Sequence, residues 1–418
     1  MNENRVSVKV LIAILSAGML SFLGILDETA TTVTFPALMR DFAVTTDQVQ
    51  WVNTLVLLVI ATIVPISSQI SLRIQTKKIF QIGVSFFIVG LLVDVFTPRF
   101  DLLLVGRALQ GIGTGIGLPL MYNIILNKIP KKKLGLMMGV GTMITACAVA
   151  FGPVVGGIIA DILNWRWIFI FSVLLIIISL FTGSYSIEQI NALKTVRFKY
   201  SQWLILAASL VFLMIGFTNI AKNNFLTFKV LGLLLLGLIC LVIWVKISSS
   251  SSDPLINPQL FKNLHFSLQL ISYCFAKIST LALGFLFPIY VQVVNHGSST
   301  LAGWVTFPGA VINALLAAWA GRILDKRGAR LPILTGVSVS LLSLFLMISF
   351  SKDLSNIEIA ILYAVYYGGY GMSFSSLMTS GLTSLEKKDH AQGNAIFNTL
   401  QQFSGALGTA FSRDVSSN

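Results

Sequence analysis

Long apolar runs separated by short polar breaks limit the possible folds of this chain more than any other feature. The runs are about 18 to 28 residues long, enough to cross ~30 Å of hydrocarbon at a helical rise of ~1.5 Å per residue. Hydrocarbon contains no water to satisfy backbone N–H and C=O groups, so each run has to be helical. We therefore predict an all-α polytopic membrane protein with about 13 transmembrane helices. The predicted spans are residues 6–26, 49–72, 79–96, 102–126, 134–160, 167–184, 203–220, 228–245, 266–294, 302–323, 331–350, 357–382 and 391–411.

The charged residues support this class and set the orientation of the chain. Only 11% of the 418 residues are charged, against roughly a quarter in soluble proteins. With the N-terminus placed in the cytoplasm, 20 of the 29 Lys and Arg residues lie on the inner side and 7 on the outer side. Positive residues concentrate on the cytoplasmic side of membrane proteins, so the net charge of +13 reflects topology and not binding of nucleic acid. We expect a multi-pass protein of the bacterial cell membrane with a cytoplasmic N-terminus and an external C-terminus.

Two polar linkers, at residues 185–202 and 247–263, separate groups of predicted spans. The predicted parts are an N-terminal six-helix half at residues 1–184, a linker with a central two-helix hairpin at 185–263, and a five-helix C-terminal half at 264–418. If the hairpin is an insertion, short basic loops recur at equivalent places in the two halves, at residues 73–78 and 321–330. Repeated helical halves with a binding site between them are the plan of many secondary transporters.

Charged residues inside the spans are candidates for function, because a charge at the bilayer centre costs on the order of 2.5–3.5 kcal/mol. Asp27 lies ~27 Å along the first helix from the inner surface, where a carboxylate is tolerated if it faces a wet cavity or carries a proton. We interpret Asp27 as a proton carrier, with Glu28 as a second candidate. Arg107 needs an acidic partner, which we expect to be Asp27, and Gln110 lies one turn further on. The alternative is that Asp27 and Arg107 only anchor helix ends, while Asp94 is expected at the outer interface.

A Gly-Pro motif interrupts the predicted span at residues 134–160. Pro153 removes a backbone donor and kinks the helix, and Gly152 and Gly156 have the spacing that allows close helix approach, with Gly157 beside them. The motif therefore predicts either a site of conformational change or a packing kink.

Lys277 lies near the midplane of the predicted span at residues 266–294. An intramembrane lysine is a candidate for a functional site. The alternatives are half of a structural ion pair, or a side chain that extends to the membrane surface. The three cysteines lie in apolar runs without metal-binding spacing, so no metal site is predicted.

These motifs resemble those of the major facilitator superfamily, and within it the fourteen-span drug:proton antiporters of the EmrB/QacA kind. Asp27, with Thr29 and Pro36, resembles the signature of the first span. Arg107 with Gln110 resembles motif B, whose arginine the resemblance implicates in proton transfer.

Two further strings carry the resemblance. Residues 152–157 resemble motif C, whose kink is implied to govern conformational exchange in antiporters, and residues 321–330 resemble motif A, a conformational latch. The positions that match motif A are Gly321, Asp325, Arg327 and Gly328. The chain departs from the family in three places: only basic residues such as Arg73 remain of the first-half motif A, Thr32 replaces an asparagine, and no fourteenth span follows.

The resemblance implies a proton-coupled efflux transporter of small lipophilic or cationic compounds, with protons and the bilayer as further partners. The spans offer few amides for hydroxyl recognition, which favours apolar substrates. No enzyme activity and no cofactor are expected, and a periplasmic adaptor is expected only in a host with an outer membrane. One alternative is a transporter of a specific metabolite or amino acid, with Lys277 binding a carboxylate. The other is a truncated membrane protein that does not transport.

Overall fold

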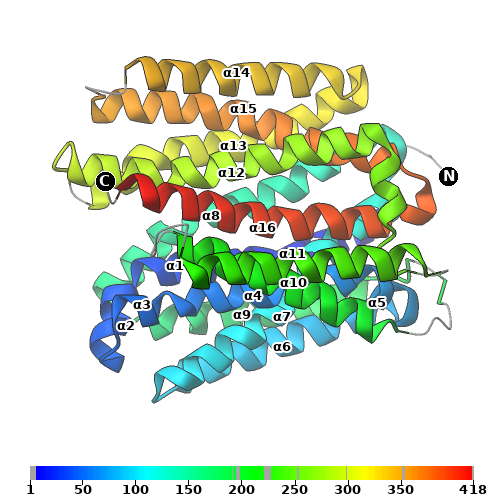
Figure 1. Ribbon diagram of the computed structural model, residues 1–418, viewed down its shortest axis with the longest axis horizontal. Helices are drawn as coiled ribbons and strands as arrows, with labels where there is room; N and C mark the ends of the chain where they lie inside the picture. Colours follow the sequence, from blue (N-terminus) through cyan, green and yellow to red (C-terminus); the bar gives the residue numbers. More distant parts are fainter. Residues whose placement is uncertain are drawn as a thin grey trace. The chain divides into compact units, whose positions relative to one another are not determined.

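The computed structural model describes residues 6–190, 192–193, 198–220, 227–251, 254–297, 299–350 and 354–416. These residues form helices joined by turns and contain no strand, which confirms the predicted all-α class (Figure 1). Parts of the predicted linkers and of the hairpin loop, at residues 191, 194–197, 221–226 and 252–253, lie outside the described residues.

Eleven helices of the described chain are long and apolar enough to cross a membrane, and they correspond to the first eleven predicted spans. Two more helices, α15 (Asn356–Thr383) and α16 (His390–Ser416), lie where the last two spans were predicted. They are 28 and 27 residues long but too polar to be counted by composition. Many of their Ser, Thr, Asn and Tyr side chains are buried, so the polarity faces other helices and not lipid.

Contacts among the helices divide the chain into two units, which are described separately. Unit 1 contains residues 1–130 and 147–198, and unit 2 contains residues 131–146 and 199–418. Unit 1 is built from α1 (Val8–Val33), α2 (Phe35–Phe42), α3 (Thr46–Val49), α4 (Trp51–Ile63), η1 (Val64–Ile66), α5 (Ser67–Arg73), α6 (Thr76–Phe96), α7 (Phe100–Lys128), the second part of α8 (Leu134–Ile162) and α9 (Arg166–Ser186). Unit 2 is built from η2 (Lys131–Lys133), the first part of α8, α10 (Tyr200–Ile220), α11 (Phe228–Ser249), η3 (Pro258–Lys262), α12 (Leu264–Val293), α13 (Ser299–Arg327), α14 (Arg330–Ser349), α15, η4 (Lys387–Asp389) and α16.

Helix α1 is longer than predicted. It continues from the expected end at residue 26 to Val33, so Asp27 lies within a helix and not at its end. The hydroxyls of Thr29, Thr31 and Thr32 donate to backbone carbonyls of the preceding turn, at 2.9, 2.5 and 2.9 Å. Because these hydroxyls find partners on their own helix, a polar stretch can remain helical at membrane depth.

The second predicted span is interrupted. Helix α4 ends at Ile63, a short 3₁₀ turn follows at Val64–Ile66, and α5 begins at Ser67. Pro65 lies in the turn, and because proline has no N–H it cannot continue the α-helical hydrogen-bond pattern.

Helix α7 is the central helix of unit 1. It contacts α1, α4 and α6, and 89% of its most apolar 18-residue stretch is buried. The corresponding share for α11 in unit 2 is only 17%. A helix surrounded by other helices does not have to be apolar on every face, so α7 can carry glycines, an arginine and a glutamine across the membrane.

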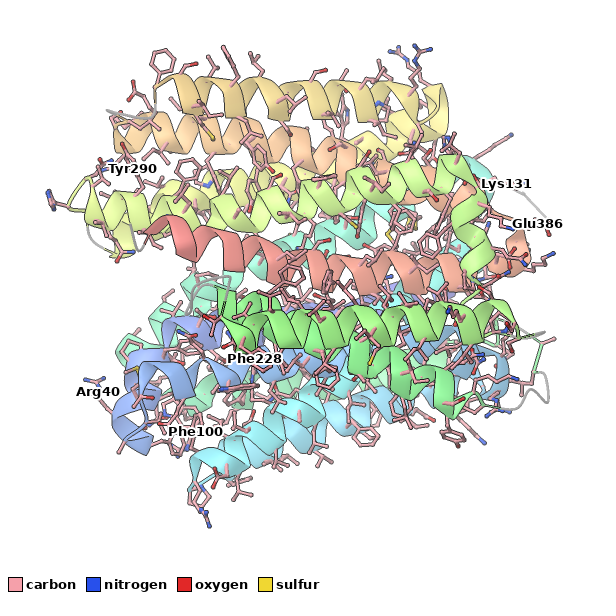
Figure 2. All side chains as sticks on the ribbon, in the orientation of Figure 1. Arg40, Phe100, Lys131, Phe228, Tyr290 and Glu386 are labelled. Carbon is pink, nitrogen blue, oxygen red and sulfur yellow. The ribbon has the colours of Figure 1, made fainter. Side chains whose placement is uncertain are left out.

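The labelled charged and aromatic side chains lie near helix ends in both units (Figure 2). In unit 2, Lys131 and Glu386 lie at one end, and Phe228 and Tyr290 lie at the other. In unit 1, the inner end of the predicted topology holds an ion-pair cluster in which Glu188 accepts from Lys9 at 2.9 Å and from Lys128 at 3.5 Å. The hydrogen bond from Lys9, together with the charge of Lys128, lowers the pKa of the Glu188 carboxyl.

Candidate functional site

The side chain of Arg107 lies at the centre of unit 1 and is fully buried. Its guanidinium makes three hydrogen bonds, each to a neutral acceptor. It donates to the Val52 carbonyl at 3.3 Å, to Gln110 Oε1 at 2.8 Å and to Asn53 Oδ1 at 3.1 Å. The ring of Phe169 covers the cation, with its centroid 5.8 Å from Cζ. The planar fork of arginine explains how one side chain can reach acceptors on α4 and α7 at once.

Asn53 connects Arg107 to α1. Its Oδ1 accepts from Arg107, while its Nδ2 donates to the Glu28 carbonyl at 3.0 Å and to Thr32 Oγ1 at 2.7 Å. The hydroxyl of Thr32 therefore takes part in this bridge. Sequence reasoning missed Asn53, which had no charge to mark it as unusual inside a span.

Gln110 connects Arg107 to Asp94 on α6. Its Oε1 accepts from Arg107, and its Nε2 donates to Asp94 Oδ2 at 2.6 Å. Asp94, which the sequence placed at the outer interface, has a side chain that is fully buried among the helices of unit 1. Distance from the end of an apolar run gave the depth of Asp94, but it could not give the direction of the side chain.

Asp27 is also fully buried, and its direct partner is a hydroxyl and not the arginine. Ser172 on α9 donates to Asp27 Oδ1 at 2.6 Å, and Oδ2 is buried without a hydrogen-bond partner. Asp27 and Arg107 interact electrostatically, but among the described residues no N···O distance of 4.0 Å or less joins them. Their pairing was predicted as direct contact, whereas α1 and Arg107 are connected through Asn53.

Glycines on α6 and α7 make room for the buried carboxylate. A Cβ on Gly106 would overlap Asp94 Oδ1, and a Cβ on Gly90 would lie 2.6 Å from the Gly106 carbonyl oxygen. Such distances do not occur in real structures, so neither helix could carry a larger residue here without moving. The absence of two side chains therefore lets Asp94 lie against the backbone of α7.

The Gly-Pro motif of α8 packs against the same part of α1. A Cβ on Gly152 would overlap Thr29 Oγ1, and one on Gly156 would lie 2.5 Å from the Ala30 carbonyl oxygen. Gly157 has no neighbour within 4 Å of such an atom, and Pro153 is exposed. Two of the four motif residues thus form a close contact with α1, immediately beyond Asp27 along that helix.

The motif at residues 321–330 lies at an end of unit 2. Asp325 accepts from the backbone N–H groups of Gly135 and Leu136 at 2.7 and 2.8 Å, at the first turn of α8. A carboxylate stabilises the exposed N–H groups and the positive end of a helix dipole. The Gly321 Cα lies so close to the Gly135 carbonyl that a side chain would overlap it.

The other residues of the two basic loops have separate surroundings. Gly328 ends α13 with a φ of 81°, a left-handed conformation that favours glycine, and its N–H donates to Leu324 O at 2.9 Å. Arg327 is exposed. In unit 1, Arg73 lies over the ring of Phe198, with 5.5 Å between Cζ and the ring centroid.

Lys277 lies in unit 2, partly buried between α12 and α16, where its Cε approaches Gly405. One turn away, Tyr273 is fully buried, stacks on Phe374 at 4.0 Å and donates to Gln401 Oε1 at 2.6 Å. Lys277 therefore lies one turn from a buried tyrosine of the same helix, which is bonded to an amide of α16.

Unit 2 contains a small group of buried amides. Asn313, Asn394 and Asn398 are each at most 5% exposed. The Oδ1 atoms of Asn313 and Asn398 are buried without a hydrogen-bond partner. Asn313 lies in a helix that reads as an ordinary apolar span, whereas α16, with Asn394 and Asn398, is more polar. In both helices only the tertiary structure shows that these amides turn inward.

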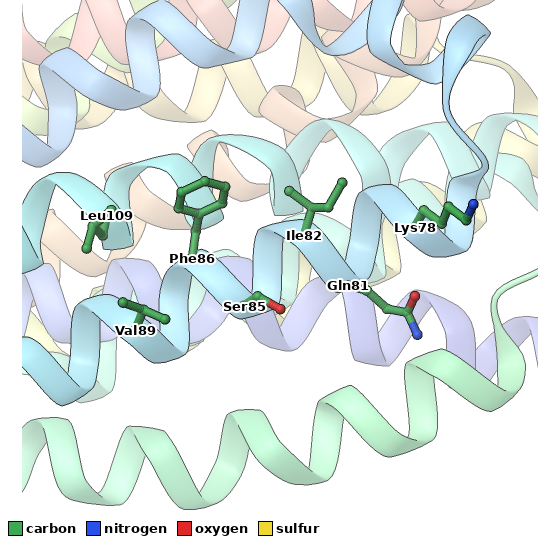
Figure 3. Close-up of a pocket in the computed structure, with 7 residues that line it drawn as sticks. All are labelled: Lys78, Gln81, Ile82, Ser85, Phe86, Val89 and Leu109. Carbon is green, nitrogen blue, oxygen red and sulfur yellow. The ribbon is translucent and has the colours of Figure 1, made fainter.

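A groove of about 410 Å³ lies elsewhere in unit 1, along α6 (Figure 3). It has Lys78 at one end and Val89 and Leu109 at the other, with Gln81, Ile82, Ser85 and Phe86 between them. It includes none of the charged residues around Arg107 and has the character of a surface that faces lipid chains.

The sequence of residues 17–409 matches the profile of the Major Facilitator Superfamily. The chain belongs to this superfamily. It is 31% identical over 392 residues to the lincomycin resistance protein LmrB of Listeria innocua, an alignment that covers 94% of this chain and 83% of that protein. It is 29% identical over 405 residues to the LmrB of Bacillus subtilis, with coverage of 96% and 84%.

A solved transporter structure has the same fold. The human organic anion transporter MFSD10 superimposes with a TM-score of 0.73 at 12% identity, over 97% of this chain and 93% of that one. Membership of the superfamily makes this chain a multi-pass membrane transporter by family, and it supports the predicted major facilitator fold.

Proposed function

We propose that this protein exports drug-like molecules from the cell in exchange for protons, as a member of the fourteen-span drug:proton antiporter branch. The observation that carries the proposal is the buried group formed by Asp27, Asp94 and Arg107. Among the described residues these are the only charged side chains that are fully buried, and all three lie in unit 1. Such charges are costly in a membrane and mark ion pathways.

Protons supply enough free energy for this task. One proton that enters down ~100 mV contributes ~2.3 kcal/mol, and one pH unit adds ~1.4 kcal/mol. Together they sustain a substrate gradient of roughly 500-fold for one proton per molecule. Asp27 is the group that we assign to this proton, because one of its oxygens is buried and has no partner.

The close contact of α8 with α1 supports a conformational role for the Gly-Pro motif. Gly152 and Gly156 pack directly on residues next to Asp27. Binding or loss of a proton at Asp27 would therefore affect the contact between α1 and α8. Asp325 at the first turn of α8 would hold the other end of that helix until the transporter changes state.

The substrate is expected to resemble lincomycin, because two of the relatives are named for resistance to it. The buried amides and tyrosines of unit 2 suit hydroxyl and amide groups, which broadens the lipophilic or cationic class inferred from the sequence. Lys277 is half-buried, and its positive charge suits a substrate with an acidic group. A transporter of a specific metabolite is therefore the second candidate.

Transport of lincomycin and ethidium by proteoliposomes, driven by an imposed pH gradient, tests the proposal. We expect uphill movement of at least one of them that stops when a protonophore is added. Asp27→Asn should abolish that movement without reducing the amount of protein in the membrane. Transport that continues without any proton gradient would contradict the proton coupling. A correctly inserted protein that moves neither compound nor any metabolite of a panel would favour the transport-dead alternative.

A further inference from the structure

Asp94 is the buried charged group to which the proposed mechanism gives no task. It lies in the last turn of α6, which ends at Phe96, and its side chain is fully buried. Its Oδ2 accepts from Gln110, and its Oδ1 is buried without a hydrogen-bond partner. Burying an ionised carboxylate with one unpartnered oxygen costs free energy, because the charge has lost its hydration. The protonated form carries no charge and avoids that cost.

The orientation of Gln110 is fixed by its two neighbours. Arg107 can only donate, so it must face the amide oxygen, and this turns the amide nitrogen toward Asp94. The amide therefore links the permanent charge of Arg107 to Asp94 without direct contact. Asn53 makes the equivalent link from Arg107 to α1.

The charges near Asp94 do not balance. Arg107 on α7 and Asp27 on α1 are the charged groups that act on it, and Glu28 acts on Arg107 from α1. On α9, Arg166 donates to the Thr97 carbonyl at 3.0 Å and lies near Asp41, so its charge is used at the outer end of the unit. One arginine cannot balance two ionised carboxylates, which would leave a net negative charge buried in the membrane.

We infer that Asp94 is a second proton-binding carboxylate, and that Asp94 and Asp27 together hold one proton while Arg107 balances the carboxylate that stays ionised. A proton adds to a carboxylate oxygen of Asp94, and no other bond forms or breaks. Arrival of a second proton would leave Arg107 without an ionised partner and favour a change of conformation. The proton-binding part of this inference is independent of transport, and only its coupling to export depends on the proposed function.

Infrared difference spectroscopy of the purified protein, between high and low pH, tests proton binding directly. The wild type should show the C=O band of a buried protonated carboxyl group, and Asp94→Asn should lose a component of that band. Asp101→Asn is the matched control, because Asp101 lies exposed at the start of α7 in an ion pair with Arg99, and this variant should keep the buried component. A spectrum of Asp94→Asn that equals the wild type overturns the inference.

Transport then separates proton coupling from structure. In proteoliposomes, Asp94→Asn should lose uphill lincomycin or ethidium movement and keep exchange of labelled for unlabelled compound, a step that needs no net proton transfer. Asp94→Glu should restore part of the uphill movement. Loss of both activities together with a lowered melting temperature, and with no change in the carboxyl band, identifies a structural role and overturns the inference. If the wild type itself moves neither compound, the proposed function fails while the infrared result still decides whether Asp94 binds a proton.

Discussion

The interiors of the two units contain different kinds of buried polar group. Unit 1 buries two carboxylates and a guanidinium. The amide of Gln110 links Arg107 to Asp94, and the amide of Asn53 links Arg107 to the backbone of α1, the helix that carries Asp27. Unit 2 buries neutral groups, among them asparagines on α13 and α16 and tyrosines on α12 and α15. Asparagine has no titratable group and tyrosine ordinarily ionises only near pH ~10, whereas carboxylates titrate at much lower pH. In the proposed function, proton binding is therefore assigned to unit 1, and contacts to a neutral part of the substrate are assigned to unit 2.

The largest effect is expected from Arg107→Gln, which removes the cation of the buried cluster. It should cost about 3–5 kcal/mol in the free energy of unfolding, because the buried carboxylate that stays ionised is left without a countercharge. Arg107→Lys should also lose stability, since the ammonium group of lysine lacks the planar, forked geometry with which the guanidinium reaches three acceptors. Thermal melting of the purified variants measures this, and the exposed Arg99→Gln is the control. A normal melting temperature and normal transport in Arg107→Gln would show that the buried charges do not set the interior of unit 1 apart from that of unit 2.

Asp27→Asn tests the unit 1 side of the comparison without removing volume. The uphill gradient should fall from roughly 500-fold to none, because the variant cannot take up the proton that drives export. Exchange without a gradient should persist, since the amide oxygen of an asparagine can still accept from Ser172 as the Asp27 carboxylate does. Measurement of both activities in the same proteoliposomes makes the test. Uphill export at the wild-type level would mean that Asp27 has no part in coupling.

Asp325→Asn tests a carboxylate of unit 2 that caps another helix. Hydrogen bonds to charged groups are worth about 1.5–3 kcal/mol, and the neutral amide oxygen should retain only part of that. We expect a shift in the balance between conformations, visible as changed accessibility of cysteines introduced near the first turn of α8. Lys326→Ala, at an exposed neighbouring position, should show no such shift. Equal labelling of Asp325→Asn and the wild type would contradict the proposed role of Asp325 in holding the first turn of α8.

The glycines of α8 allow a comparison within one motif. Gly156→Ala should cost about 1–3 kcal/mol, because its Cβ would meet the backbone of α1 at Ala30. Gly157→Ala is the matched control and should be close to neutral, since nothing lies within 4 Å of its Cβ. Stability and transport should both follow this order. Equal behaviour of the two variants would show that α1 and α8 do not need close contact.

The smallest effect is expected in unit 2. Tyr273→Phe removes one hydrogen bond, to Gln401, which is worth about 0.5–1.5 kcal/mol, and keeps the stacking on Phe374. If this region contributes to substrate contacts, KM should change by at most roughly tenfold while dependence on the proton gradient stays the same. A change in proton coupling instead would place titratable chemistry in unit 2 as well.

The helical structure of the molecule was largely readable from the sequence. Apolar runs gave the helices at nearly all the observed positions, because the requirement for backbone hydrogen bonding in hydrocarbon leaves no alternative. Two boundaries were wrong for local reasons: the threonines of α1 bond to their own helix, and Pro65 breaks the second span. Arg107 and Asp27 could be identified because a charge inside an apolar run is conspicuous.

What the sequence by itself determined is the class of protein, its helices and the charged residues that need an explanation. Only the tertiary structure decided which groups those residues meet. Asp94 resembled a residue at the membrane surface until the close approach of α6 and α7 at Gly90 and Gly106 placed it inside. Asn53 and Gln110 carry no charge, so their part in connecting Arg107 to two other helices was not visible. The physical reason is that hydropathy records how deep a residue lies along a helix, while hydrogen bonding depends on the direction in which its side chain points and on the helix packed against that face.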